Sequence, residues 1–387
     1  MRRHASSEMV VRISLVVILA VAAGGCEAEG NRSNSKAEAI LTRAAEYLWE
    51  RQGADGGWHS ELHGVMRTGQ SLTPYLMMAL TEVPERLIGG QEDGAERALD
   101  FIRNHVNEQG ILGLSDSDII EYPNYSTAYA LRALLRHGEA ADSGLIRQMT
   151  RYLVAEQFTE ARGIGPDHPA YGAWGFGETN LAKGQVGHVD LSHTRHVLEA
   201  IADADAGDSA HFRKATRFLR LLQKHPLHEQ SVKGTYDGGF YFSPVVLDQN
   251  KAGRDEEAFR SYATATCGGL MALLVTGHSL EDEPVKGATK WLEENPELDY
   301  PAGIPEDDPD QWRKVLFFYH LSVRAEAYRA VGMKGEWREE MVRLIGERQR
   351  QDGSFANPYG SPNKEDDPLL ATALVIRTLT NLLQTNP

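Results

Sequence analysis

The chain has 387 residues, with 55 acidic side chains against 40 Lys and Arg, which gives a formal net charge of −15. This acidic balance argues against a nucleic-acid partner, because backbone phosphates attract clustered Lys and Arg. The length and a hydrophobic content of 41% suffice for one large domain or a ring of repeats.

The first 26 residues are typical of a bacterial export signal. A basic start precedes the apolar stretch 13–23, which is shorter than the ~20 apolar residues of a membrane-spanning helix. The following Ala23-Gly24-Gly25-Cys26 resembles the lipoprotein cleavage box, although Ala23 stands where Leu is usual. We expect lipid attachment at Cys26, with cleavage without lipidation as the alternative, and a polar tether over 27–36. The protein would then be exported and held on a membrane by lipid, in the periplasm or at the cell surface.

Residues 37–387 repeat a helical pattern about six times. A typical copy has a Thr, an apolar residue four positions later, and then Ala and another apolar residue. Offsets of four and seven place three of these positions on one helical face, and the small Ala permits close packing. The copies begin at Thr73, Thr127, Thr194, Thr266, Arg324 and Thr372, of which the fifth is the looser match.

A second helical pattern precedes each copy of the first, and often ends in a Gln. Two alternating helix types predict an all-α repeat architecture, and units of roughly fifty to seventy residues exceed those of open helical solenoids. We therefore predict an α/α toroid of about six hairpins, with an open superhelix as the alternative. The second pattern begins at Tyr47, Phe101, Tyr152, Phe218, Trp291 and Leu344. The inner helices should begin near Ser71, Tyr125, Asp190, Tyr262, Leu316 and Pro368, and their core residues should be Met77, Leu131, Leu198, Leu270, Tyr328 and Ile376.

The ends of the outer helices carry a more specific signal. Tyr47-Leu48-x3-Gln52-x3-Gly56-x-Trp58 is similar to the "QW" repeat of the squalene cyclase and prenyltransferase superfamily, and Asp190-Leu191-Ser192-His193-Thr194 looks like an inner-helix start of the same repeats. The resemblance covers roughly 37–383. It implies an α/α toroid whose inner helices surround a central cavity that holds a ligand. It does not imply the reaction, because one fold hosts many chemistries.

The acid motif of the best-known members is missing. Class II terpene cyclases use Asp-x-Asp-Asp, in which crowded carboxylates keep one group acidic. The nearest match, Asp116-Ser117-Asp118-Ile119, lacks the fourth carboxylate, and we keep Asp118 as a candidate catalytic acid. We interpret Asp307-Asp308-Pro309-Asp310 and Asp366-Asp367-Pro368 as loop acids or helix-start charges rather than as a diphosphate–metal site.

The strongest chemical cluster is His188-x-Asp190-x-x-His193-x-x-His196. Asp190 is a natural N-cap for the third inner helix, and the two histidines follow at helical spacing. Asp190, His193 and His196 are our candidate catalytic residues, and with His188 they are weak candidates for a divalent-metal site. The alternative is a helix cap with surface histidines. We expect Cys267 to be a small buried residue rather than a reactive or zinc-bound thiol.

Two long connections, 158–189 and 225–262, carry aromatic residues among glycines. Connections of such length in a compact domain are usually functional or disordered. Their aromatic rings can stack on sugars, hold an apolar ligand, or merely fill space. The candidate substrate-binding residues are Tyr125, Trp174, Tyr236, Tyr241 and Tyr262. We place the site where the inner helices begin, because the free N–H groups at helix N-termini favour anionic ligands.

Three functional classes remain open at this point. The first is a cavity enzyme or binder of an isoprenoid-like molecule. The second is a polysaccharide lyase or hydrolase built on a toroid. The third is a non-catalytic scaffold like the thioester-domain toroids of complement-type proteins, although the chain has no Gly-Cys-Gly-Glu-Gln. An apolar cavity would favour the first class, convergent acids the second and a filled cavity the third. No cofactor is certain.

Overall fold

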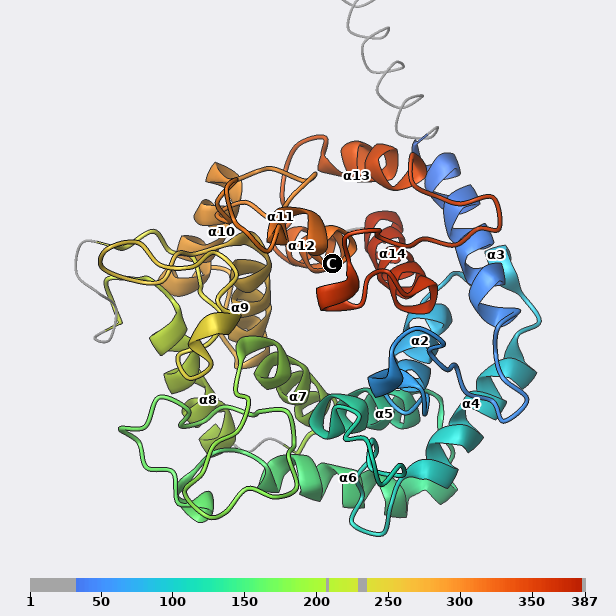
Figure 1. Cartoon of the computed structure of the whole chain (residues 1–387), viewed down its shortest axis with the longest axis horizontal. Helices are drawn as coiled ribbons and strands as arrows, with labels where there is room; N and C mark the ends of the chain where they lie inside the picture. Colours follow the sequence, from blue (N-terminus) through green and yellow to red (C-terminus); the bar gives the residue numbers. More distant parts are fainter. Residues whose placement is uncertain (1–32, 207–208, 229–234, 385–387) are drawn as a thin grey trace, which may run out of the picture.

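A computed structural model describes residues 33–206, 209–228 and 235–384. Over these residues the chain is helical without a β-strand, and inner and outer helices alternate (Figure 1). The inner helices are α2(Leu72–Thr81), α5(Pro123–His137), α7(Leu191–Asp203), α9(Ala263–Val275), α12(Phe317–Ala330) and α14(Pro368–Leu383). The outer helices are 33–49, α4(Glu92–His105), α6(Ser143–Ala155), α8(Ser209–Leu222), α10(Glu283–Glu294) and α13(Trp337–Gly346). Two short helices, α3(Glu85–Ile88) and α11(Trp312–Val315), lie in connections.

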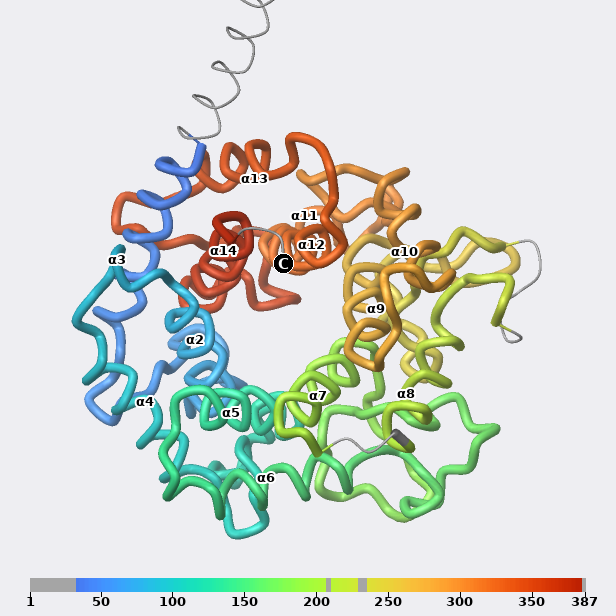
Figure 2. The backbone as a smooth tube through the Cα atoms, turned by 180° about the vertical axis from the view of Figure 1, so that it is seen from behind, coloured from blue at the N-terminus to red at the C-terminus, as the bar shows by residue number. Residues whose placement is uncertain are grey.

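The inner helices form a closed ring. Each contacts the next in chain order, and α14 returns to contact α2. The view from behind shows the same closure, with α13 beside the first outer helix (Figure 2). The predicted toroid is therefore confirmed, and the open superhelix is excluded.

The predicted helix starts agree with the observed ones. Ser71, Asp190, Tyr262 and Leu316 are the N-cap residues of α2, α7, α9 and α12, and α14 begins at Pro368. Helix α5 begins two residues before Tyr125. The six predicted core residues are 0–3% exposed: Met77, Leu131, Leu198, Leu270, Tyr328 and Ile376.

The repeated Thr fixes the connection that precedes its own helix. In five copies its Oγ1 accepts the backbone N–H of a buried residue in that connection, at 2.9–3.1 Å. The pairs are Thr73 with Trp58, Thr127 with Leu112, Thr194 with Trp174, Thr266 with Phe240, and Thr372 with Phe355. In the looser fifth copy Arg324 instead donates to the carbonyls of Leu292 and Asn295. Its guanidinium provides the link that the other copies make through a hydroxyl.

The Gln of the QW-like repeat joins neighbouring outer helices. Gln52 Nε2 donates to the carbonyl of Gly56 in its own turn (2.9 Å) and to that of Gly94 in α4 (2.7 Å). Gln349 repeats this arrangement with Gly353 and with Ile40 in the first outer helix, both at 3.0 Å, and so closes the outer ring. The Gln residues are structural, as the spacing indicates.

Buried carboxylates satisfy the free N–H groups at several inner-helix starts. Asp190 caps α7, Glu121 accepts from Ser71 at α2, Asp367 caps α14, and Glu365 accepts from Phe318 and Tyr319 in α12. These four acids are 0–2% exposed. The interpretation of 366–368 as helix-start charge is confirmed at Asp367.

Among the described residues, no helix is long and apolar enough to cross a membrane. Cys26 and the expected signal and tether up to residue 32 lie outside the described residues. Cys267 is a buried free thiol whose pKa is raised by burial to about 12, as befits an inert core residue.

Candidate functional site

Asp190 joins the two nearest histidines of the predicted cluster. Its Oδ1 accepts the backbone N–H of His193 at 2.8 Å, which caps α7. Its Oδ2 lies 2.8 Å from His193 Nδ1 and 2.9 Å from His188 Nε2. The predicted association of His188, Asp190 and His193 is therefore present.

The charges of this cluster are set by its contacts. Burial would raise the pKa of Asp190, but the charge of His193 and the hydrogen bonds from both histidines hold it well below its usual range. The hydrogen bond to Asp190 raises the pKa of His188. With Nδ1 directed at Asp190, the other ring nitrogen of His193, Nε2, does not contact this carboxylate. That atom is buried and has no hydrogen-bond partner among the described residues.

Aromatic rings surround His193 and His196 inside the ring. Tyr125 lies 5.8 Å from His193 and 4.9 Å from His196 between ring centroids, and Phe176 lies 6.0 Å from His193. Tyr129 contacts His196, with its hydroxyl 3.3 Å from Nδ1. The two histidines therefore lie against an aromatic wall supplied mainly by α5.

More tyrosines line the same interior from other helices. Tyr75 of α2 packs edge-on against Tyr129 at 5.1 Å. Tyr319 of α12 hydrogen-bonds Ser192 beside His193, and Tyr262 begins α9. Burial raises the pKa of every one of these phenols, that of Tyr319 to about 12, so all are neutral. We call Tyr75, Tyr125, Tyr129, Tyr262 and Tyr319 the tyrosine cluster.

An ion-pair network crosses the ring interior. Arg195 of α7 pairs with Glu199 at 2.6 Å and with Glu326 of α12 at 2.5 Å. Arg132 of α5 pairs with Glu199 at 2.6 Å and with Asp203 at 2.7 Å. Burial would raise the pKa of Glu199, but Arg195 and Arg132 hold it well below its usual value. The acids here are matched by arginines, so they form a structural network rather than a pair of free carboxyl groups.

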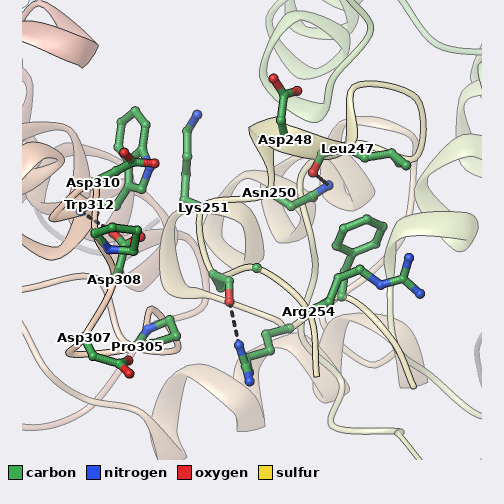
Figure 3. A pocket seen from close by; sticks show the side chains of 15 residues that line it. Leu247, Asp248, Asn250, Lys251, Arg254, Pro305, Asp307, Asp308, Asp310 and Trp312 are labelled. Carbon is green, nitrogen blue, oxygen red and sulfur yellow. Dashed lines mark hydrogen bonds between the residues drawn. The ribbon is translucent and has the colours of Figure 1, made fainter. Parts of the chain in front are cut away.

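An open pocket of about 640 Å³ lies between the connections that precede α9 and α11. Asp307, Asp308 and Asp310 gather on one side and Asp248 on the other, with Lys251 between them (Figure 3). Lys251 lies 3.9 Å from the centroid of the Trp312 ring, and burial lowers its pKa to about 8. Asp308 also accepts the backbone N–H of Trp312 at 2.7 Å, as a helix-start acid does.

The remaining predicted site residues make other contacts. Asp118 is exposed on the loop where Arg67 pairs with Asp116. Tyr236 is 40% exposed. Trp174 is fully buried and donates to the carbonyl of Leu153, as Trp58 does to that of Leu48. Tyr241 stacks on Phe259 and donates to Leu221.

A metal could be held by His188, Asp190 and His193, whose ligand atoms all lie within 4.8 Å of one another. In the structure both histidines use the nitrogen nearest Asp190 to hydrogen-bond its Oδ2. Metal binding would have to replace these protons, because a ligand nitrogen must be deprotonated. The three side chains can therefore hold a divalent cation, and without one their hydrogen bonds hold them together.

The toroid is similar to solved structures of the type II terpene cyclase MstE from Scytonema. A variant in complex with geranylgeranyl dihydroxybenzoate, described as substrate, matches with a TM-score of 0.55 and 14% identity, over 91% of this chain and 99% of that chain. The apo enzyme matches with a TM-score of 0.56 and 14% identity, over 89% and 98%. A crystal structure of a protein from Actinoplanes gives 0.57 and 16%, over 90% and 100%.

These matches show a terpenoid cyclase-like fold, and at such identities they show the fold alone. A scan against protein families found no match, and a search of curated proteins found none either.

Sequence reasoning named Tyr125 and Tyr262 but missed Tyr75, Tyr129 and Tyr319 and the charged residues of the interior. A signal was present, since Glu199 stands between the core residues Leu198 and Ala200. A charge inside an otherwise apolar inner-helix motif indicates a buried partner. The partner itself could not be named, because Arg132 lies on the neighbouring helix.

Proposed function

We propose that this toroid binds, and acts on, an elongated apolar molecule of isoprenoid type between its inner helices, at the end where they begin. The observation that carries the proposal is His193, whose unpartnered Nε2 is buried among aromatic rings. Aromatic walls suit an apolar chain, and MstE, of similar fold, has been captured with a geranylgeranyl substrate.

His193 is suited to move one proton. Asp190 receives its Nδ1–H, which orients the ring and stabilises the imidazolium form while Nε2 accepts or donates the proton. An imidazolium, with an ordinary pKa of about 6.5, is too weak an acid to protonate an alkene. Asp190 cannot do so either, because its depressed pKa keeps it ionised. The proposed chemistry is therefore the removal by Nε2 of a proton from a carbon next to a carbonyl, and its return to the same or a conjugated carbon, rather than class II cyclisation.

The test uses the purified mature domain in D2O with 2,3-dihydrogeranylgeranial, whose C2 carries acidic protons next to the carbonyl, and with geranylgeraniol as a probe of binding alone. His193→Asn keeps an N–H near the Nδ1 position for Asp190 but removes Nε2. We expect it to abolish deuterium incorporation into the aldehyde (the turnover), read by mass spectrometry, while probe binding and the urea midpoint stay near wild type. His59→Asn is the matched control, because His59 pairs with Asp55 outside the inner ring. A stability loss in His193→Asn with unchanged turnover would make the histidine structural.

The open pocket favours a second candidate, a polysaccharide-active enzyme. Asp307, Asp308 and Asp310 face Asp248 across it, and carboxylates on both sides of a cleft suit glycosidic-bond chemistry. A glycan binding screen with wild type and Asp310→Asn tests this reading. Glycan binding lost in the variant would support it, and no binding by wild type would dismiss it.

We further propose that the protein is exported and anchored by lipid at Cys26. The support is the export signal and the cleavage box in the sequence. Cys26→Ser should move the protein from the membrane fraction to the soluble fraction. An unchanged distribution would refute lipidation and leave signal cleavage open.

A further inference from the structure

We infer that Arg377, on the inner face of α14, is the subsite for a carboxylate carried by the ligand. The side chain is only 8% exposed. Within residues 33–206, 209–228 and 235–384, its guanidinium makes no ion pair or hydrogen bond; only its backbone carbonyl is used, by Thr380 and Asn381. That the ligand is apolar rests on the proposed function. That it carries a carboxylate rests on the contacts of Arg377.

Arg377 differs in this respect from Arg195 and Arg132, and from Arg324, which has no carboxylate partner but donates to the carbonyls of Leu292 and Asn295. Arg195 and Arg132 each pair with two carboxylates at 2.5–2.7 Å. A buried charge without a counter-charge is costly, so proteins pair such groups or reserve them for a ligand. The nearby acids are already engaged, since Glu326 pairs with Arg195 and Glu82 pairs with Arg136.

The surroundings of Arg377 hold it inside the ring. Its guanidinium carbon lies 5.5 Å from the centroid of Tyr75 on α2 and 5.8 Å from that of Tyr129 on α5. Such cation–π contacts fix the plane of the group without using its N–H donors. Tyr129 also reaches His196 on α7, so the guanidinium and the histidines border one aromatic surface.

The site selects a single carboxylate. A guanidinium offers two parallel N–H donors that match the two oxygens of a carboxylate. A diphosphate carries more charge than one cation can balance, and Glu326 and Glu199 inside the same ring would repel it. The substrate class is therefore an apolar acid, with its chain along the tyrosine cluster and its carboxylate at Arg377.

The experiment compares three chain-bearing probes of equal length: geranylgeranic acid, geranylgeraniol and geranylgeranyl diphosphate. We expect wild type to bind the acid at least about tenfold more tightly than either other probe, the increment of one charge-assisted pair. Arg377→Met should bind acid and alcohol equally. Arg329→Met is the control, because Arg329 pairs with Asn381 on the same helix pair and should leave the preference intact.

Benzoate, which has no isoprenoid chain, separates the two proposals. It should raise the thermal midpoint of wild type and leave that of Arg377→Met unchanged. Benzoate stabilisation without lipid binding would uphold the subsite and refute the isoprenoid ligand. Lipid binding without preference for the acid would refute the subsite and leave the proposed function standing. No response to either probe would refute both, and Arg377→Gln replaces the Met variant should that one fail to fold.

Discussion

Glu365 gives the sharpest test of the energetics of this fold. Its carboxylate accepts the backbone N–H groups of Phe318 and Tyr319 at 2.9 Å and the side-chain amide of Asn357 at 3.1 Å. Glu365 precedes α14 in the chain, and its fully buried side chain lies against the first turn of α12. Burial raises its pKa to about 7, although these hydrogen bonds favour the ionised form and oppose the shift.

The direction and size of the effect follow from linkage. Between its ordinary value of 4.5 and about 7, Glu365 is protonated in the folded chain and ionised in the unfolded chain. The folded state then binds more protons, so its stability falls as pH rises through this window and levels off above it. At 1.36 kcal/mol for each pH unit, the loss is about 3 kcal/mol.

Urea denaturation of wild type and Glu365→Gln at several pH values between 5 and 8.5 isolates this carboxyl. The variant cannot ionise there, so its stability relative to wild type should improve by about 3 kcal/mol from the acid to the alkaline end. Glu61→Gln, at an exposed position, controls for the loss of one carboxyl. A difference that stays constant with pH would refute the reasoning, as would a Glu365 carboxyl resonance that titrates near 4.5.

Two further predictions test the repeat contacts. Thr266→Val should lower the free energy of unfolding by about 1–3 kcal/mol, because the N–H of Phe240 loses its acceptor. Thr289→Val in α10 should change it by less than about 0.5 kcal/mol, since that hydroxyl donates to the carbonyl of Val285 in its own helix. Equal urea midpoints for the two variants would contradict this. Gln349→Ala should cost about 1–3 kcal/mol, because it removes the two hydrogen bonds that Nε2 donates and the one that Oε1 accepts from Arg43. It should also speed amide exchange over 33–49. Faster exchange near residue 349 alone would show that Gln349 does not hold the ring closed.

The fold could be predicted because its information is local and repeated. A helical period and a turn signal recur in each unit. A helix that is hard to predict from one copy of the repeat can therefore be predicted from the other copies. The fifth copy shows the limit of this reasoning. Arg324 appears there as a poor match to Thr, and only the structure shows that its guanidinium also ties α12 to the preceding segment, by donating to carbonyls at the end of α10 and just after it.

The site could be predicted only where its contacts are local. Asp190 and His193 are three residues apart at a helix start, so the cap and the ring contact follow from spacing. Tyr125 joins them because consecutive inner helices are neighbours in a ring. Asp118 was chosen from an incomplete acid motif and Tyr236 from its place in a long aromatic connection, and the structure leaves both exposed.

The helix-start argument for an anionic ligand changes once the structure is known. Free N–H groups at helix N-termini attract anions, but at four of the inner helices a buried carboxylate of the protein already accepts from them. A ligand anion at that end would meet these negative charges as well as His193. An arginine whose guanidinium has no ion pair or hydrogen bond within the described residues lies instead beside Tyr75 and Tyr129 of the tyrosine cluster, at Arg377. A ligand that enters where the helices begin would therefore place its reacting group at His193 and its carboxylate at Arg377.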